Sequence, residues 1–265
     1  MSRPCVLVFA GSDPSGGAGI QADIEAISAM GAHALPVITA LTVQDNDHVF
    51  AVHPVATDLI RQQATALTDK ITVAAVKVGI VGNRDNVEMI AALIGALKRQ
   101  YPRLPVVLDP VLASGHGDPL AIDDAIAGMT PLMQCATLIT PNMPEAVALC
   151  RGQRDAVLQA ETLVQAGCQH VLIKGGHGEG DTVVNRWFSA GRSRTWYWPR
   201  LAGAFHGSGC TLASAIAALL AMGNTMETAM DLGQLYCQKT LDASYAIADG
   251  QRIPHRSDVF FKETV

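Results

Sequence analysis

Strand-like and helix-like segments alternate along most of the chain, and this alternation limits the possible folds more than any other feature of the sequence. The strand-like segments are short and continuously apolar, which is typical of strands covered on both faces in a parallel sheet. They span residues 5–10, 35–41, 74–80, 105–111, 136–139 and 170–174, and helical patterns span residues 20–30, 58–68, 84–99, 123–133, 156–166 and 226–246. The pattern predicts a three-layer α/β/α sandwich around a mostly parallel central sheet.

Two segments depart from this alternation and indicate the edges of the sheet. Residues 182–188 and 193–198 form a pattern typical of a small antiparallel hairpin. Residues 49–55 contain Pro54, which favours a short edge strand or a flap over a core strand. No shift in composition marks a boundary along the 265 residues, so we expect a single domain over residues 1–265.

Composition excludes several classes of function. Apolar residues make up 49% of the chain, no stretch reaches the length of a membrane helix, and a net charge of −5 without a basic run argues against nucleic-acid binding. A small-molecule substrate is then the default expectation. The six cysteines are far apart with no Cys-x-x-Cys pair, which predicts reduced thiols and a cytoplasmic location.

Polar residues follow several predicted strands at the point where each strand ends. The glycine-rich loop 11–19 follows the first strand, and Asp109 and Lys174 each come directly after a buried strand. Ligands bind at this carboxyl edge in open α/β sheets, so we expect these loops to cluster there. The position of Asp109 is compatible with a turn or helix cap and also with a metal site. The Lys174 side chain can extend to solvent or face a phosphate across the loop. Asn142 and Glu145 have the spacing of a helix-capping box.

The stretch 204–211 precedes an apolar run of good helix formers, which predicts that a helix begins between Ser208 and Cys210. Glycines on both sides of Ser208 let several backbone N–H groups converge, and the helix dipole adds to them, so the place suits an anion. The same field is expected to lower the pKa of the Cys210 thiol from its usual value of about 8.5. The alternative is an ordinary helix cap followed by a buried cysteine. His206 is predicted to orient the loop through a hydrogen bond rather than to act in catalysis.

Two common nucleotide motifs fit poorly or are absent. Gly17-x-Gly19-x-x-Ala22 matches the dinucleotide pattern Gly-x-Gly-x-x-Gly/Ala of oxidoreductases, but six residues separate it from the first strand. No acidic residue ends the second strand to hold a ribose, and the phosphate-loop pattern Gly-x4-Gly-Lys-Ser/Thr does not occur. If the protein is a kinase, it is not of the P-loop kind.

A set of motifs in fixed order resembles the hydroxymethylpyrimidine/phosphomethylpyrimidine kinases of thiamine biosynthesis, which belong to the ribokinase-like superfamily. The motifs are Gly11-Ser12-Asp13, the run 15–23, Thr42-Val43-Gln44, Lys77-Val78-Gly79, Leu108-Asp109-Pro110-Val111, Thr140-Pro141-Asn142-x-x-Glu145, Lys174-Gly175-Gly176-His177 and the run 206–211. The resemblance implies phosphorylation of 4-amino-5-hydroxymethyl-2-methylpyrimidine and then of its monophosphate. ATP and Mg²⁺ are the implied cofactors, and a homodimer is the implied assembly.

The resemblance also implies roles for individual residues. Cys210 takes the place of the aspartate base of sugar kinases in the superfamily, beside an anion hole formed by the amides of Gly207, Ser208, Gly209 and Cys210 itself. The implied pyrimidine contacts are Gly11, Asp23, Gln44, Ile80 and Val107; the implied nucleotide contacts are Asn142, Lys174, Gly176 and Thr211; the implied metal residues are Asp109 and Glu145. Lys174 would also neutralise phosphate charge.

The chain departs from the family pattern in three places. Ile80 stands where members often have methionine, Ser208 replaces a usual threonine, and the loop 112–120 lacks an expected lysine that would grip the transferred phosphate. Three other functions stay open. The protein could be a pyridoxal or pyridoxine kinase of the same superfamily, a kinase that performs only one of the two steps, or a ligand-binding protein without catalytic activity. The presence of Asp109, Glu145, Lys174 and Cys210 argues against the last, because binding alone needs no base.

Overall fold

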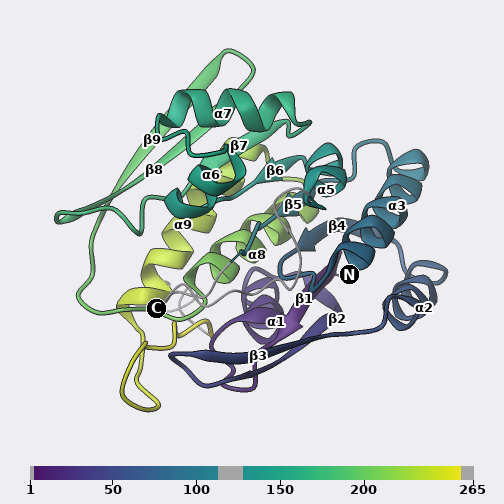
Figure 1. Cartoon of the computed structure of the whole chain (residues 1–265), viewed down its shortest axis with the longest axis horizontal. Coiled ribbons are helices and arrows are strands. Elements are labelled where there is room, and N and C mark those ends of the chain that lie inside the picture. The colour runs from purple at the N-terminus through teal and green to yellow at the C-terminus, as the bar shows by residue number, and fades with distance from the viewer. Residues whose placement is uncertain (1–2, 113–127, 258–265) are drawn as a thin grey trace.

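The computed structural model describes residues 3–112 and 128–257. Within these ranges the strands form one nine-stranded sheet in the order β3-β2-β1-β4-β5-β6-β7-β8-β9 (Figure 1). The strands are β1 Cys5–Ser12, β2 His33–Gln44, β3 Val49–Pro54, β4 Val73–Val78, β5 Val106–Leu108, β6 Leu138–Ile139, β7 His170–Ile173, β8 Thr182–Ser189 and β9 Arg192–Pro199. The six central strands, β2, β1, β4, β5, β6 and β7 in sheet order, pair in parallel. The edge strand β3 at one end, and β8 and β9 at the other, pair antiparallel. The predicted fold class is confirmed.

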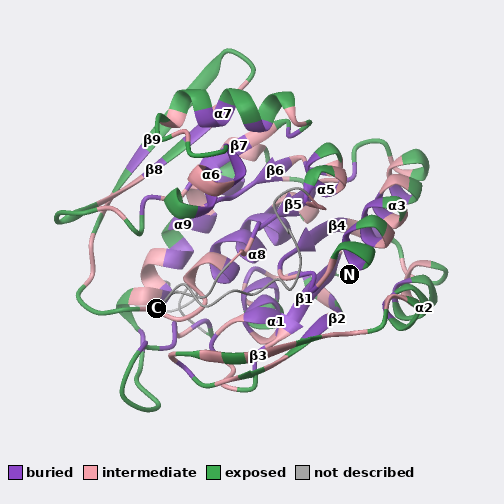
Figure 2. Ribbon diagram, viewed as in Figure 1, coloured by how far each residue is buried: buried purple, intermediate pink, exposed green. Residues whose placement is uncertain are grey.

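Helices cover both faces of the sheet and complete the three layers. They are α1 Gly19–Ala29, α2 Thr57–Thr68, α3 Arg84–Gln100, α5 Thr130–Cys135, α6 Met143–Leu149, α7 Ala156–Gln165, α8 Ser208–Ala221 and α9 Met226–Asp242. Successive β1 side chains point to opposite faces, so Val6 and Val8 pack with α1, α8 and α9. Leu7 and Phe9 pack in the second core, with α2, α3, α5, α6 and α7. Figure 2 shows most of β1, β4 and α8 as buried.

Some boundaries differ from the predicted ones for identifiable reasons. β2 continues to Gln44 because its second half pairs with β3, which supplies backbone partners beyond β1. β5 is shorter than predicted: it ends at Leu108, before Asp109 and Pro110, which has no N–H to donate. α9 ends at Asp242, since Tyr245 pairs instead with Ile253. Most of the predicted helix 123–133 and the loop 113–120 lie outside the described residues; α5 begins at Thr130.

The loops at the carboxyl edge of the parallel strands meet around the start of α8. The segment that follows α9 reaches the same place, since the Arg252 backbone exchanges hydrogen bonds with Ala204 and His206. None of the helices in the described ranges is long and apolar enough to span a membrane.

Candidate active site

Gly207 allows α8 to begin in close contact with the glycine-rich loop after β1. It has φ +75°, and an added Cβ would lie 2.1 Å from the carbonyl oxygen of Gly17 and 2.8 Å from Cα of Ala18. Only glycine fits this position without strain. α8 has no side-chain cap, so the N–H groups of its first turn remain available to a ligand. The start of α8 therefore has the geometry of an anion site.

Cys210 lies in the first turn of α8, and the backbone N–H of Gly19, at the start of α1, donates a hydrogen bond to its sulfur. Burial raises the pKa of the Cys210 thiol to about 11; Lys77 acts in the opposite direction, while Asp23 and Asp109 raise the pKa further. The expectation of a lowered thiol pKa is therefore wrong. The helix termini do favour the thiolate, but desolvation outweighs them.

Asp23 and Lys77 form an ion pair directly behind this cysteine, and both side chains are fully buried. The Lys77 ammonium lies 2.8 Å from one Asp23 oxygen and 2.9 Å from the other, and Ser214, one helical turn after Cys210, donates to the carboxylate at 2.7 Å. Burial alone would lower the pKa of Lys77, but Asp23 raises it above its usual value and keeps the amine charged. Asp23 is thus placed behind the site, with both oxygens occupied, and not in a cavity wall where a pyrimidine contact was expected.

Asp109 and Lys174 form a second ion pair, and this one faces a cavity. The Lys174 ammonium and the Thr140 hydroxyl both donate to Asp109 Oδ1, at 2.7 and 3.0 Å. The other oxygen, Oδ2, is buried without a hydrogen-bond partner. Burial would raise the pKa of Asp109, but Lys174 and Lys77 hold it below its usual value. A charged carboxylate therefore presents one unused oxygen at the site.

Glu145 forms the predicted capping box with Asn142 at the start of α6. The backbone N–H of Asn142 donates to Glu145 Oε2 at 2.7 Å, and the backbone N–H of Glu145 donates to Asn142 Oδ1 at 2.8 Å. Burial raises the pKa of the Glu145 carboxyl to about 7, with Asp109 adding to this effect and Lys174 opposing it. The capping role does not exclude a further role, because Glu145 also lines the cavity beside Asp109.

Two cavities adjoin at the start of α8, and Lys174, Ser208 and Gly209 line both. The smaller, about 170 Å³, is also lined by Gly11, Gln44, Ile80, Asp109, Glu145, Gly207 and Cys210. The larger, about 420 Å³, is also lined by Gly176, Asn185, Trp198, Gln234 and Cys237, and Asn142 belongs to both. At the junction a Cβ added to Gly209 would lie 3.0 Å from the Lys174 ammonium. The site therefore consists of two chambers joined by amide groups and a lysine.

Two further residues with expected roles do not line either cavity. Val107 is fully buried in the core of the sheet. Thr211 is also buried, and its hydroxyl donates to the Gly207 carbonyl at 2.8 Å.

Sequence reasoning missed Arg256, which is 1% exposed and ties two loops of the site together. Its Nε donates to the Thr211 hydroxyl at 2.8 Å, and its Nη2 donates to the Gly17 carbonyl. A third contact, 3.2 Å long, reaches Glu25 on α1. No local pattern near residue 256 signals this role, because these three partners of the guanidinium lie more than 40 residues away in the sequence.

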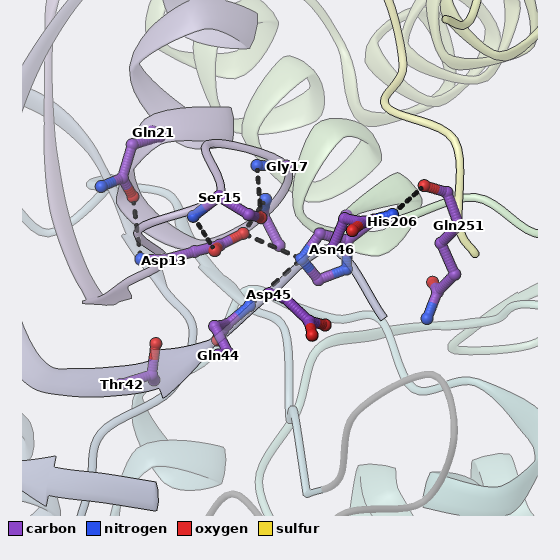
Figure 3. A network of polar contacts seen from close by, with 12 residues as sticks. Asp13, Ser15, Gly17, Gln21, Thr42, Gln44, Asp45, Asn46, His206 and Gln251 are labelled. Atoms are coloured by element: carbon purple, nitrogen blue, oxygen red, sulfur yellow. Dashed lines mark hydrogen bonds and ion pairs between the residues drawn. The ribbon is translucent and has the colours of Figure 1, made fainter. Parts of the chain in front are cut away.

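Asp13, Gln44 and His206 form a polar network at the rim of the smaller cavity (Figure 3). His206 Nε2 lies 2.8 Å from Asp13 Oδ2 and 3.2 Å from the Gln44 side-chain amide. The loop-orienting hydrogen bond predicted for His206 is thus confirmed, with Asp13 as its partner.

A family model described as phosphomethylpyrimidine kinase matches residues 13–255. The chain belongs to this family. It is 36% identical over 259 residues to the hydroxymethylpyrimidine/phosphomethylpyrimidine kinase of Rhizobium meliloti, covering 92% of this chain and 93% of that protein. Membership of the phosphomethylpyrimidine kinase family makes the protein a phosphotransferase, as expected.

Solved structures of related kinases share the fold. A phosphomethylpyrimidine kinase from Clostridium difficile superposes with a TM-score of 0.76 at 33% identity, covering 90% of this chain and 100% of that one. The pyridoxal kinase of Bacillus subtilis, solved as an ADP complex, gives a TM-score of 0.86 at 27% identity, covering 97% and 98%. The expected ribokinase-like fold is confirmed, and its likeness extends to pyridoxal kinases.

Proposed function

We propose that this member of the phosphomethylpyrimidine kinase family transfers the γ-phosphoryl group of ATP to 4-amino-5-hydroxymethyl-2-methylpyrimidine and then to its monophosphate. The observation that carries the proposal is the pair of adjoining cavities. The smaller has the size for one aromatic ring and the larger for a nucleotide, and they meet where the α8 amides and Lys174 supply positive charge. Phosphoryl transfer needs this arrangement of positioning and charge stabilisation.

Mg²⁺ fits the residues at the floor of the smaller cavity. Asp109 Oδ2 is a buried carboxylate oxygen without a partner, and Glu145 lines the same cavity. One or two carboxylates together with substrate phosphates are the usual Mg²⁺ ligands in proteins. We assign Asp109 and Glu145 to hold the ion, which supplies neutralisation of phosphate charge when bound. The remaining chemistry belongs to the side chains and amides of the chain.

The first step requires removal of a proton from an alcohol. Ser208 and Cys210 both lie in the first turn of α8 and line the smaller cavity. A thiol ionises far more readily than a hydroxyl, so we assign the Cys210 sulfur as the group that accepts this proton. Lys77, charged behind the cysteine, favours the thiolate. The N–H groups at Ser208 and Gly209 stabilise the negative charge of the moving phosphoryl group, and the Lys174 ammonium, which lies next to Gly209, neutralises phosphate charge.

The second step makes a weaker demand on the base. A phosphate monoester has a second pKa of about 6 and is largely ionised at neutral pH. It needs positioning and neutralisation, which Lys174 and the α8 amides supply, but no proton acceptor. One site can therefore serve both reactions. The implied homodimer stays a prediction.

Pyridoxal is the second candidate acceptor, because the fold superposes on the Bacillus subtilis pyridoxal kinase with a TM-score of 0.86. One assay separates the candidates: the purified protein, ATP and Mg²⁺ with hydroxymethylpyrimidine, its monophosphate or pyridoxal, and product identified by mass spectrometry. We expect both pyrimidines to be phosphorylated with higher kcat/KM than pyridoxal. Turnover of pyridoxal alone would overturn the proposal.

The Cys210→Ala variant tests the proton acceptor in the same assay. We expect alcohol phosphorylation to fall by about 10²- to 10⁴-fold, which is the usual contribution of a general base, with little change in ATP affinity. Phosphorylation of the monophosphate should fall less. Near wild-type turnover of the alcohol would remove Cys210 from the mechanism.

A further inference from the structure

Three polar side chains from distant segments meet at the rim of the smaller cavity. Asp13 comes from the loop after β1, Gln44 from the end of β2, and His206 from the loop before α8 (Figure 3). A single ring nitrogen, His206 Nε2, lies 2.8 Å from Asp13 Oδ2 and 3.2 Å from Gln44 Nε2. The hydrogen on that nitrogen therefore decides the polarity of both contacts.

Asp13 can only accept hydrogen bonds. It is 2% exposed, and its two oxygens accept from the backbone N–H groups of Ser15 at 2.8 Å and Ala18 at 2.7 Å. Burial would raise the pKa of Asp13, but hydrogen bonds from His206, Ser15 and Ala18 hold it below its usual value. Because an ionised carboxylate has no donor, His206 Nε2 must carry a hydrogen and donate it to Asp13. This holds for the neutral ring and for the imidazolium alike.

The consequence reaches Gln44. A ring nitrogen that carries a hydrogen cannot accept from an amide NH₂ group, so we assign the Gln44 amide with its oxygen, in place of Nε2, toward His206. The nitrogen and oxygen of a glutamine amide are nearly identical in shape, and their assignment follows from the hydrogen-bond network. With the oxygen held by His206, the NH₂ group turns toward the cavity, which Gln44 lines.

We propose that Asp13 and His206 are positioning residues that fix Gln44 as a hydrogen-bond donor toward the acceptor substrate. The ligand atom opposite Gln44 is then a hydrogen-bond acceptor, such as a ring nitrogen of an aminopyrimidine, and not its exocyclic amine. The identity of the substrate rests on the proposed function, whereas the polarity of Gln44 rests only on the three side chains. His206 also directly precedes Gly207, so the same contact joins ring recognition to the anion site.

The protonated nitrogen of His206 is measurable without any substrate. Nitrogen-15 NMR of histidine-labelled protein distinguishes the two neutral tautomers and the imidazolium, and the spectrum of His206→Gln identifies the signals of His206 among the eight histidines. We expect a hydrogen on Nε2 at neutral pH. A neutral ring with its hydrogen on Nδ1 alone would overturn the proposal, whatever the enzyme phosphorylates.

Kinetics of two matched variants test the effect on recognition. His206→Gln keeps an N–H group that can donate to Asp13 and Gln44, whereas His206→Leu has similar volume and no donor. We expect His206→Leu to raise the pyrimidine KM about tenfold, the value of one hydrogen bond, with ATP KM unchanged, and His206→Gln to restore most of the loss. Equal impairment of both variants, or a change in ATP KM of the same size, would show a general loop distortion and overturn the proposal.

A double variant shows whether His206 acts through Gln44. Gln44→Ala alone should raise the pyrimidine KM more than it lowers kcat. If His206 acts by orienting Gln44, adding His206→Leu should raise KM little further, because the two effects share one contact. Additive effects would overturn the proposal. Failure of the proposed function would look different: neither pyrimidine would be a substrate of the wild-type protein, while the tautomer result would stand.

Discussion

Two Asp–Lys ion pairs lie close enough to Cys210 for their charges to act on its thiol, and they differ in how completely their atoms are bonded. In the Asp23–Lys77 pair both side chains are 0% exposed, and both carboxylate oxygens contact the lysine. In the Asp109–Lys174 pair the lysine side chain is 13% exposed, and one carboxylate oxygen has no partner. The same residue types at the same sheet edge thus perform different tasks.

The difference shows that hydrogen-bond satisfaction, more than residue type, separates a structural pair from a functional one. A fully bonded pair has nothing to offer a ligand, and its removal is felt as lost stability. A carboxylate with a spare oxygen at a cavity carries an unmet bonding capacity, which a cation or substrate can meet. Substitution in the first pair should therefore mainly lower stability, and substitution in the second pair should mainly lower turnover.

The largest expected effect is on stability, at the fully bonded pair. Asp23→Ala leaves the Lys77 charge buried without a partner, so we expect the free energy of unfolding to fall by about 3–5 kcal/mol in urea titrations. The matched control is the double variant Asp23→Leu/Lys77→Met, which removes both charges and should recover most of the loss. If the single and double variants are equally unstable, the pair acts through packing rather than charge.

The next effect is on turnover, at the pair with the spare oxygen. Asp109→Asn keeps the shape but removes the charge, and we expect kcat to fall by about 10²- to 10³-fold, the usual cost of one electrostatic contact in a transition state. The urea midpoint should change less than in Asp23→Ala. A variant with near wild-type kcat and a large loss of stability would make the two pairs equivalent and break the comparison.

The smallest expected effect is the pH dependence at Cys210, whose thiol interacts with the charges of both pairs. Its thiol pKa is raised to about 11 by burial, so few molecules carry a thiolate at neutral pH. The kcat/KM for the alcohol should therefore rise by up to about tenfold per pH unit above neutrality, whereas the rate with the monophosphate should level off above its own pKa of about 6. Parallel pH profiles for the two substrates would argue against a thiolate base.

The architecture and the position of the site were predictable because they depend on local patterns. Continuous apolar runs specify buried parallel strands, and the residue after such a run must emerge at the carboxyl edge, as Asp109 and Lys174 do. The start of α8 was equally readable, since glycines precede a run of helix formers. Gly11, Gln44 and Ile80 lie in one cavity wall for the same reason.

What the sequence could not reveal depends on which atoms pair across the fold. Asp23 was expected at the pyrimidine, but whether its carboxylate faces a cavity or a lysine 54 residues away is decided by how α1 packs on β1 and β2, beside the strand that carries Lys77. The thiol pKa of Cys210 was predicted with the wrong sign, because the helix field is visible in the sequence and the depth of burial is not.

Arg256 shows that the active site depends on a segment of the chain that lies beyond the cavity-lining helices and loops. Among the described residues that line the two cavities, all but Gln251 lie before the end of α9. The guanidinium that holds the Gly17 carbonyl and the Thr211 hydroxyl nevertheless comes from the segment after this helix. A nascent chain that has emerged only as far as α9 would contain nearly all the residues that line the cavities, but it would lack the Arg256 contacts to Gly17 and Thr211. Catalytic competence should accordingly be acquired late in folding, in one step, when that arginine leaves water.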